Sequence, residues 1–396
     1  MALTKVDISL MDNTGTTANK LLAYDGSGNL PAVDGSQLTN VATGITESSS
    51  DPALDTNPSG GVGTQWNNTT SGKCYICTDA TAGSNVWKNV GAGTGDIVPW
   101  NYPGETNGYH MGGTPTGSWT LTNIIQKVVF ATEANATDLA DLTVARRFCA
   151  GASSDTYGFC IGGYQHNEID RFSFASGSNA TDVGDTSFSS QVTGCSSSTH
   201  GYCVANGGGG TPAGVTIEKF SNTSLGNTTD VGDLTHNHNS TGGGASSADY
   251  GYTCGASYPT GQGGDKIDKF SFASGTQNAS LIGLTSNQLF GNGALSSLTY
   301  GYCVSGAIAG PNSTSNKIEK WSFSSDGNAS DIADMTVAHT DLNNNTCQST
   351  TNGYTMGGWS GGRINNLQRV SFTTDSNSVD VADMFGTPLN GAGANV

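Results

Sequence analysis

The sequence has little positive charge and no long apolar run. Only 15 of its 396 residues are Lys or Arg, against 32 acids, so the formal net charge at pH 7 is -17. This balance repels phosphate backbones and anionic lipid surfaces, and we expect neither a nucleic-acid partner nor insertion into a membrane. No stretch reaches the roughly 18 apolar residues of a membrane span, and the first residues do not resemble a signal peptide. We therefore expect synthesis in a cytoplasm without a cleaved signal.

The motifs of common catalytic and metal sites are also missing. The sequence contains no Gly-x-Ser-x-Gly elbow, no Walker loop and no His-Glu-x-x-His. Among its six histidines, only His236 and His238 form a close pair. That pair could ligate a metal with help from another subunit, but we favour an exposed polar loop. We expect no enzyme activity, no cofactor and no bound metal.

The nine cysteines do not form a disulfide framework in our interpretation. Cys160, Cys203 and Cys303 directly follow glycine-aromatic pairs, which is typical of small buried side chains in strands. Cys74 and Cys77 lie three apart in a strand-like run. Because successive strand residues alternate between faces, these two thiols should point opposite ways and form a poor metal clamp.

Glycine, with 57 residues, is abundant, and residues 108–372 are strongly repetitive. A glycine followed by an aromatic residue recurs six times, at Gly108, Gly158, Gly201, Gly251, Gly301 and Gly353. A six-residue phrase follows each pair. Each copy begins with an apolar residue and has a base at its third position, and the copies start at Ile125, Ile169, Ile217, Ile267, Ile318 and Leu367. Glycines of successive pairs are 43 to 52 residues apart, a spacing typical of repeat architectures.

Six repeats of four short strands predict an all-β fold with a six-bladed β-propeller at residues 107–396. Residues 389–395 match the first strand of other repeats, and the first repeat lacks such a strand. We predict that this C-terminal strand closes the first blade. Before the propeller, we expect an N-terminal attachment or oligomerisation segment at 1–48, a small β module at 49–92 and a linker at 93–106.

Several segments resemble proteins of bacteriophage particles. Residues 29–41 resemble a segment of tail-fibre and other virion proteins, and residues 64–90 are similar to a small β module of phage structural proteins. The repeats resemble kelch repeats, and arrays of this kind resemble those of cyanophages. The double glycine typical of kelch repeats stands at Gly112-Gly113, Gly162-Gly163 and Gly357-Gly358.

This resemblance implies a structural protein of the virion, most directly a tail fibre. The N-terminal region would then bind other tail proteins, the chain would form a homotrimer, and the propeller would mediate host attachment by binding a surface glycan or protein. A head or neck decoration protein without a receptor is one alternative. A polysaccharide-degrading propeller enzyme is a second.

The third position of the repeated phrase is basic in all six copies, Lys127, Arg171, Lys219, Lys269, Lys320 and Arg369. Both faces of a blade meet neighbouring blades, so these cations should be largely buried and need partners. The fourth strand offers aspartates at Asp141, Asp185, Asp233, Asp334 and Asp383. We predict a repeated ion pair within each blade, with a ring of cations lining a site as the alternative. The fourth repeat has Leu281 and Leu284 instead, so Lys269 must find another acid or stay solvated.

Loops between the second and third strands vary most in length. Loops on one face of a rigid scaffold are where binding sites usually form. They carry residue types that stack on sugars or anchor protein contacts, namely Trp119, Tyr164, Tyr258, Trp359 and Arg363. We predict a receptor-binding face there; aromatics that merely cover blade edges are the alternative.

Overall fold

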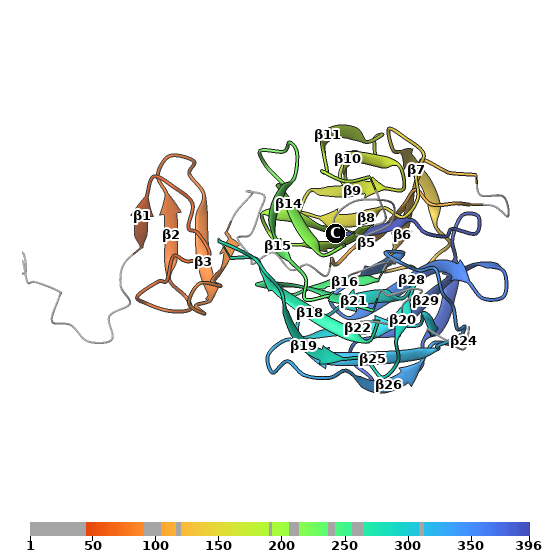
Figure 1. The fold of residues 1–396 in the computed structure, drawn as a ribbon. Coiled ribbons are helices and arrows are strands. Elements are labelled where there is room, and N and C mark those ends of the chain that lie inside the picture. The colour runs from red at the N-terminus through yellow and green to blue at the C-terminus, as the bar shows by residue number, and fades with distance from the viewer. Residues whose placement is uncertain are drawn as a thin grey trace, which may run out of the picture. The chain divides into compact units, whose positions relative to one another are not determined.

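The computed structural model describes residues 45–90, 104–115, 120–189, 192–205, 214–236, 242–255, 264–273, 275–308 and 313–396. Within these ranges every regular element is a β-strand, and no helix could cross a membrane. The chain divides into two compact units, Met1–Pro99 and Trp100–Val396 (Figure 1). The division falls inside the predicted linker. Gly104 and Thr106, at the end of the predicted linker, already contact Ser349 and Val396 of the larger unit: Gly104 forms a β-bridge with Ser349, and the backbone N–H of Thr106 donates to the carbonyl of Val396.

The smaller unit contains one four-stranded sheet in the order β1-β2-β3-β4. Its strands are β1 (Thr46–Ser48), β2 (Gln65–Asn68), β3 (Cys74–Asp79) and β4 (Val86–Asn89). β1 pairs parallel to β2, and the other pairs are antiparallel. The boundary predicted between residues 48 and 49 was wrong, because β1 is already an edge strand of this sheet. Tyr75, Cys77 and Trp87 form its buried core.

Among its described residues the larger unit contains six four-stranded antiparallel sheets, which we number 1 to 6. Sheet 1 is β31 (Ala392–Asn395), β5 (Asn107–Met111), β6 (Ile124–Val129) and β7 (Thr137–Asp141). Sheet 2 is β8 (Ala150–Ser153), β9 (Tyr157–Gly163), β10 (His166–Ser173) and β11 (Thr181–Asp185). Sheet 3 is β12 (Val192–Ser196), β13 (His200–Ala205), β14 (Thr216–Ser221) and β15 (Thr229–Asp233).

The remaining sheets follow the same order. Sheet 4 is β16 (Gly243–Ser246), β17 (Tyr250–Cys254), β18 (Lys266–Ser271) and β19 (Ser280–Leu284). Sheet 5 is β21 (Gly293–Ser296), β22 (Tyr300–Val304), β25 (Lys317–Ser322) and β26 (Ser330–Asp334). Sheet 6 is β27 (Thr346–Gln348), β28 (Asn352–Trp359), β29 (Arg363–Ser371) and β30 (Val379–Asp383). A short additional sheet joins β20 (Leu289–Phe290), β23 (Ala307–Ile308) and β24 (Ser313–Thr314).

The two repeated phrases occupy the second and third strands of each sheet and pack on one another. A Cβ atom at Gly201 would overlap the ring of Phe220 on the adjacent strand, so glycine makes room for the aromatic residue of the third strand. The aromatic residue after each glycine contacts a ring of the following sheet. Tyr302 and Phe372, for example, stack with ring centroids 4.7 Å apart. Such pairs contribute to stability beyond their buried area, and here they pack each sheet against the next.

The innermost strands lie side by side and include the C-terminal one. β31 pairs with β5, with Ala392 opposite Met111 and Asn395 opposite Gly108, so the last strand of the chain completes sheet 1. The inner strands contact one another in the order β31, β8, β12, β16, β21, β27 and again β31. A Cβ atom at Gly151 would overlap the carbonyl of Gly393, which shows why small residues are needed where these backbones meet.

An asparagine after each third strand joins neighbouring sheets. Its Oδ1 accepts a hydrogen bond from the backbone N–H near the end of the preceding sheet's fourth strand. The six donor and acceptor pairs are Asp141 and Asn179, Asp185 and Asn227, Asp233 and Asn278, Leu284 and Asn328, Asp334 and Asn377, and Asp383 and Asn135. The next backbone N–H donates to the carbonyl of the same fourth-strand residue. Each junction therefore has a two-bond clamp that also occupies part of an exposed strand edge.

The second position of the repeated phrase forms another link between sheets. Its side chain is a buried carboxylate or amide, Gln126, Asp170, Glu218, Asp268, Glu319 or Gln368. Each accepts a hydrogen bond from a backbone N–H in the connection that leaves the preceding sheet, donated by Phe385, Thr143, Ser187, Thr235, Ser286 and Val337 respectively. Buried polar groups need such partners, so this position has a structural role in every sheet.

Candidate functional site

Three of the five predicted receptor-binding residues lie in described parts of the chain. Tyr164 joins β9 to β10, while Trp359 ends β28 and Arg363 begins β29. Tyr164 is 44% exposed and Trp359 is 41% exposed. Trp119 and Tyr258 lie outside the described residues. All three residues lie in or beside the connection between the second and third strands. Each therefore stands at that end of its own sheet.

Tyr164 is part of a stack that the sequence did not suggest. The guanidinium of Arg147, in the connection from β7 to β8, lies 5.3 Å from the Tyr164 ring centroid and 5.1 Å from that of Phe148. The backbone N–H of Tyr164 donates to the carbonyl of Arg147 at 2.9 Å. Phe148 has a φ of +56°, in the left-handed region that a bulky side chain rarely adopts. Strained backbone of this kind is enriched at binding sites.

Arg363 is held against sheet 1 and beside an acid. Its Nη1 donates to the carbonyl and, at 2.8 Å, to Oγ1 of Thr114. Burial raises the pKa of Asp341, and the positive charge of Arg363 opposes this shift. Burial lowers the pKa of Arg363, Asp341 acts in the opposite direction, and the charge of Arg147 lowers it further. Because the charge of Arg147 affects the pKa of Arg363, the two arginines belong to one region of the surface. This region includes residues from sheets 6, 1 and 2.

We call Arg147, Phe148, Tyr164, Trp359 and Arg363, with Asp341, the arginine–aromatic cluster. Sequence reasoning missed Arg147, Phe148 and Asp341. One signal was available: Arg146-Arg147 is the only pair of adjacent bases in a chain with 15 bases. The positive φ of Phe148 had no sequence signature, because the usual glycine is absent there.

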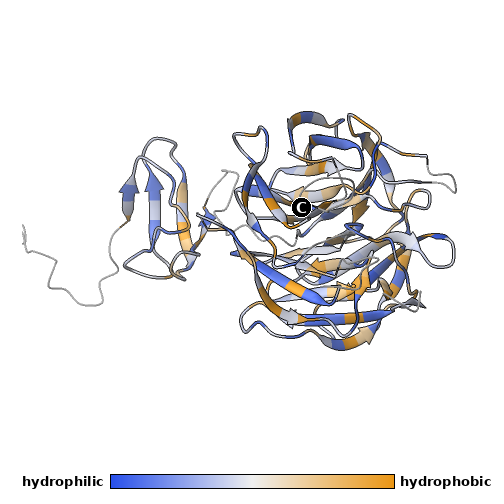
Figure 2. Cartoon of the chain, in the orientation of Figure 1, coloured by the Kyte–Doolittle hydropathy of each residue, from blue (hydrophilic) through white to orange (hydrophobic). Residues whose placement is uncertain are grey.

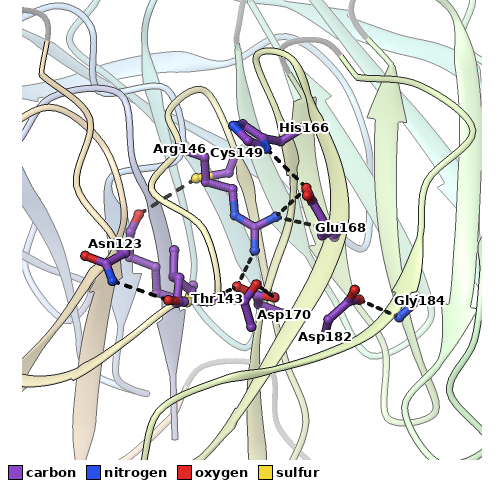
Figure 3. A network of polar contacts seen from close by, with 11 residues as sticks. Asn123, Thr143, Arg146, Cys149, His166, Glu168, Asp170, Asp182 and Gly184 are labelled. Atoms are coloured by element: carbon purple, nitrogen blue, oxygen red, sulfur yellow. Dashed lines mark hydrogen bonds and ion pairs between the residues drawn. The ribbon is translucent and has the colours of Figure 1, made fainter.

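Arg146, the neighbour of Arg147 in the sequence, belongs to a polar network with Glu168, His166 and Asp170 (Figure 3). Its side chain is fully buried, with Nη2 at 2.5 Å from Asp170 and Nη1 donating to the carbonyl of Glu168 at 2.7 Å. Nδ1 of His166 lies 3.3 Å from Oε2 of Glu168. Although burial alone would raise the pKa of Glu168, its hydrogen bonds and the charges of Arg146 and His166 lower it. This network fixes the hairpin that presents Tyr164.

The predicted ion pairs within each blade were wrong. Lys269, Lys320 and Arg369 instead bind acids in the turn of the following sheet, Asp326 at 2.9 Å, Asp375 at 2.6 Å and Glu133 at 2.8 Å. Within the described residues no ion pair joins the six bases to Asp141, Asp185, Asp233, Asp334 or Asp383. The strand register explains the error: Lys219 is opposite Thr229 at the start of the fourth strand, whereas Asp233 is opposite Thr216.

The other three bases face turns without an acid at the equivalent position. Glu133, Asp326 and Asp375 stand two residues before the clamping asparagine, where sheets 2, 3 and 4 have Gly177, Leu225 and Thr276. Arg171 instead stacks on Tyr157, with its guanidinium 4.3 Å from the ring centroid. All six bases stand on third strands rather than on the inner ones. The expectation for Lys269 is confirmed, because it finds another acid in Asp326.

His236 is not exposed, contrary to the interpretation of the His236–His238 pair that we favoured. Its side chain is buried, and Nδ1 lies 3.1 Å from Oδ2 of Asp268. It thus belongs to the packing between sheets 3 and 4 rather than to an exposed loop, while His238 lies outside the described residues. All nine cysteines are free thiols. Cys74 and Cys77 lie on opposite faces of their strand, as predicted.

Comparison with known proteins shows a similarity of fold. No family model and no curated protein matches the sequence. Among solved structures, one described as "Structure of YjhT" is similar, with a TM-score of 0.52 and 11% sequence identity. The similarity covers 69% of this chain and 96% of that one. At this identity the likeness is one of fold alone.

Proposed function

We propose that the chain is a bacteriophage virion protein, a tail fibre whose larger unit recognises a glycan or protein on the host surface. That unit would be a six-bladed, kelch-like β-propeller without enzyme activity. The pairing of β31 with β5 and the cyclic order of inner-strand contacts support six blades. The smaller unit and the residues before it would attach the fibre to other tail proteins and hold several copies together.

The observation that carries the proposal is the arginine–aromatic cluster. The asparagine clamp and the buried carboxylate or amide of the phrase recur at all six junctions between neighbouring sheets. Both therefore belong to the scaffold, and neither marks a single position for recognition. The cluster, in contrast, occurs once. Arg147 and Phe148, between β7 and β8, stack with Tyr164, between β9 and β10, and Arg363 of sheet 6 hydrogen-bonds to Thr114 next to sheet 1. Exposed aromatic faces and arginines contribute strongly to sugar and protein contacts. Weak binding at each site would be raised by several copies on one particle.

The test is adsorption of the purified full chain to a panel of cyanobacterial strains, the hosts that the resemblance implies. We expect Tyr164→Ala and Trp359→Ala each to weaken binding about tenfold, consistent with a loss of roughly 1.4 kcal/mol at a contact residue. Leu298→Ala is the matched control, because Leu298 is 53% exposed in the turn between β21 and β22, at the other end of the sheets. Binding that none of these changes affects would contradict the proposal.

Electron microscopy with an antibody against the chain distinguishes the remaining alternatives. Labelling at the tail tip supports a receptor-binding fibre. Labelling at the head or neck favours a decoration protein. Shortened products after incubation with host polysaccharides would identify an enzyme instead.

A further inference from the structure

The fourth strand of sheet 4 differs from the fourth strands of the other five sheets. β7, β11, β15, β26 and β30 each have aspartates at two positions three residues apart, for example Asp182 and Asp185 in β11. β19 has Leu281 and Leu284 at these positions. Hydrophobic residues occur along most strands of the larger unit (Figure 2), but these two reach the surface, with Leu281 48% and Leu284 38% exposed. Sheet 4 therefore has an apolar outer edge where the other described sheets have a negatively charged one.

A bulge brings the two leucines and Lys266 to one face of sheet 4. Leu284 is opposite Lys266 and Leu281 is opposite Asp268, with a shift of register between the two pairs. Directly paired residues share a face, as do strand residues two apart, so Lys266, Leu281 and Leu284 lie on the same side. We call these three residues the sheet-4 edge patch.

Sheet 5 shows how the same arrangement behaves when the acids are present. Its third strand begins with Lys317, the counterpart of Lys266, and its register has the same shift. Nζ of Lys317 lies 3.0 Å from Oδ2 of Asp331, which stands where sheet 4 has Leu281. Within the described parts of the chain no hydrogen bond or ion pair involves the side chain of Lys266. The patch thus combines two exposed leucines with a cation that has no acidic partner there.

The patch can bind a partner through side chains but not through strand addition. The backbone N–H of Leu284 donates to Oδ1 of Asn328 at 3.0 Å, and its carbonyl accepts a hydrogen bond from Ala329 at 2.9 Å. The carbonyl of Ile282 accepts a hydrogen bond from Gly327 at 3.1 Å. The turn of sheet 5 therefore already occupies this stretch of the strand edge, and the side chains of the patch are what remains for a partner.

Charge favours a second copy of the chain as the partner of this patch. Each copy has a formal net charge of -17, and contact between two of the other fourth strands would place aspartates opposite aspartates. Contact between β19 and an acidic strand would bury carboxylates against leucines. When two patches meet instead, apolar side chains cover apolar side chains.

The position of Lys266 is compatible with such a contact. A two-fold axis in the contact plane, perpendicular to β19, reverses the strand, so the two lysines stand at opposite ends of the paired patches. β19 has five residues, and at about 3.4 Å per residue its length exceeds the Debye length of about 8 Å at physiological ionic strength. The two positive charges therefore repel only weakly, and the patch is self-complementary.

We propose that the sheet-4 edge patch joins two copies of the chain about a two-fold axis, with Leu281 and Leu284 of each copy packed on those of the other. An isologous contact of this kind doubles whatever assembly the rest of the chain forms. The inference goes beyond the proposed function, because neither a host ligand nor the smaller unit enters it.

The first test gives β19 the aspartates that the other five strands carry. In the full-length chain we expect Leu281→Asp with Leu284→Asp to halve the mass measured by sedimentation equilibrium. The variant should fold, because it has the pattern of β11 and β26, and Lys266 gains the partner that Lys317 has. Val379→Asp is the matched control, because Val379 is also 48% exposed on a fourth strand, and it should leave the mass unchanged. A one-chain mass for the unchanged protein, or a mass that the double variant does not alter, would overturn the inference.

Cross-linking locates the contact without relying on the loss of an assembly. Eight of the nine cysteines are buried and Cys74 is half-exposed, so Cys74→Ser with Leu281→Cys provides one accessible thiol per chain. A flexible bismaleimide should link two chains of this variant. It should link at least tenfold fewer chains of Cys74→Ser with Asp182→Cys, the equivalent position of sheet 2. Equal yields at the two positions would contradict a contact at sheet 4. Binding of the double aspartate variant to host cells, measured per chain, shows separately whether the proposed recognition function holds.

Discussion

The side chain of Asn135 accepts a hydrogen bond of 3.0 Å from the backbone N–H of Asp383, 248 residues further along the chain. The backbone N–H of Ala136 donates to the carbonyl of the same aspartate at 2.8 Å. The same arrangement joins the other five pairs of neighbouring sheets, for example Asn227 with Asp185. The junction between the last and first sheets is thus built like every internal junction.

We expect Asn135→Ala and Asn227→Ala to destabilise the protein by similar amounts, about 1 kcal/mol each, the net contribution of a typical hydrogen bond. Urea unfolding monitored by tryptophan fluorescence measures both. Asn352→Ala is the control, because its side chain bonds only to the adjacent residue Thr351 among the described contacts. A large loss for Asn227→Ala with none for Asn135→Ala would mean that the asparagine clamp does not stabilise the junction between the last and first sheets as it does an internal one.

The fold was predictable because its signals are local. Glycine-aromatic pairs and the six-residue phrases mark second and third strands within single repeats, and residues 389–395 were recognisable as a missing first strand. Links between repeats were not predictable in the same way. Asn135 and Gln126 have counterparts in every repeat, but a recurring residue does not reveal that its partner lies in the neighbouring sheet. Lys320 was assigned to its own blade for this reason.

The inter-sheet ion pairs should contribute little and should respond to salt. Asp326→Asn removes the partner of Lys269, whose side chain is 17% exposed while that of Asp326 is 37% exposed. Pairs this open to solvent contribute roughly 0.2–1 kcal/mol. We expect the loss at low ionic strength to shrink severalfold in 1 M NaCl. A double-mutant cycle with Lys269→Met isolates the pair, and a coupling of several kcal/mol would contradict this assignment.

Arg146 and Asp170 should behave in the opposite way, because both side chains are completely buried. Asp170→Ala leaves the Arg146 guanidinium without its main counter-charge, and breaking a buried pair costs about 3–5 kcal/mol. We expect the double variant Arg146→Met with Asp170→Leu to be clearly more stable than Asp170→Ala. Urea unfolding of the three proteins checks the order. Equal losses for the single and double variants would show that packing, not the unpaired charge, determines the cost.

His110 should make the protein sensitive to acid. Its side chain is fully buried, Nε2 lies 3.2 Å from Oδ1 of Asn345, and burial lowers its pKa to about 4. In the unfolded chain its pKa is about 6.5, so below pH 6.5 the unfolded state takes up a proton that the folded state does not. The contribution to stability is complete above pH 6.5, falls as the pH drops toward 4, and amounts to about 3 kcal/mol.

His110→Gln should remove this part of the pH dependence. We therefore expect the difference in unfolding free energy between the original protein and the variant to change by about 3 kcal/mol between pH 7 and pH 4. Urea unfolding at pH 7, 6, 5 and 4 measures this difference, and it cancels the contribution of carboxylates such as Glu168 that titrate in both proteins. A constant difference for His110→Gln across this range would mean that the buried ring gains a proton in the folded state as readily as in the unfolded one.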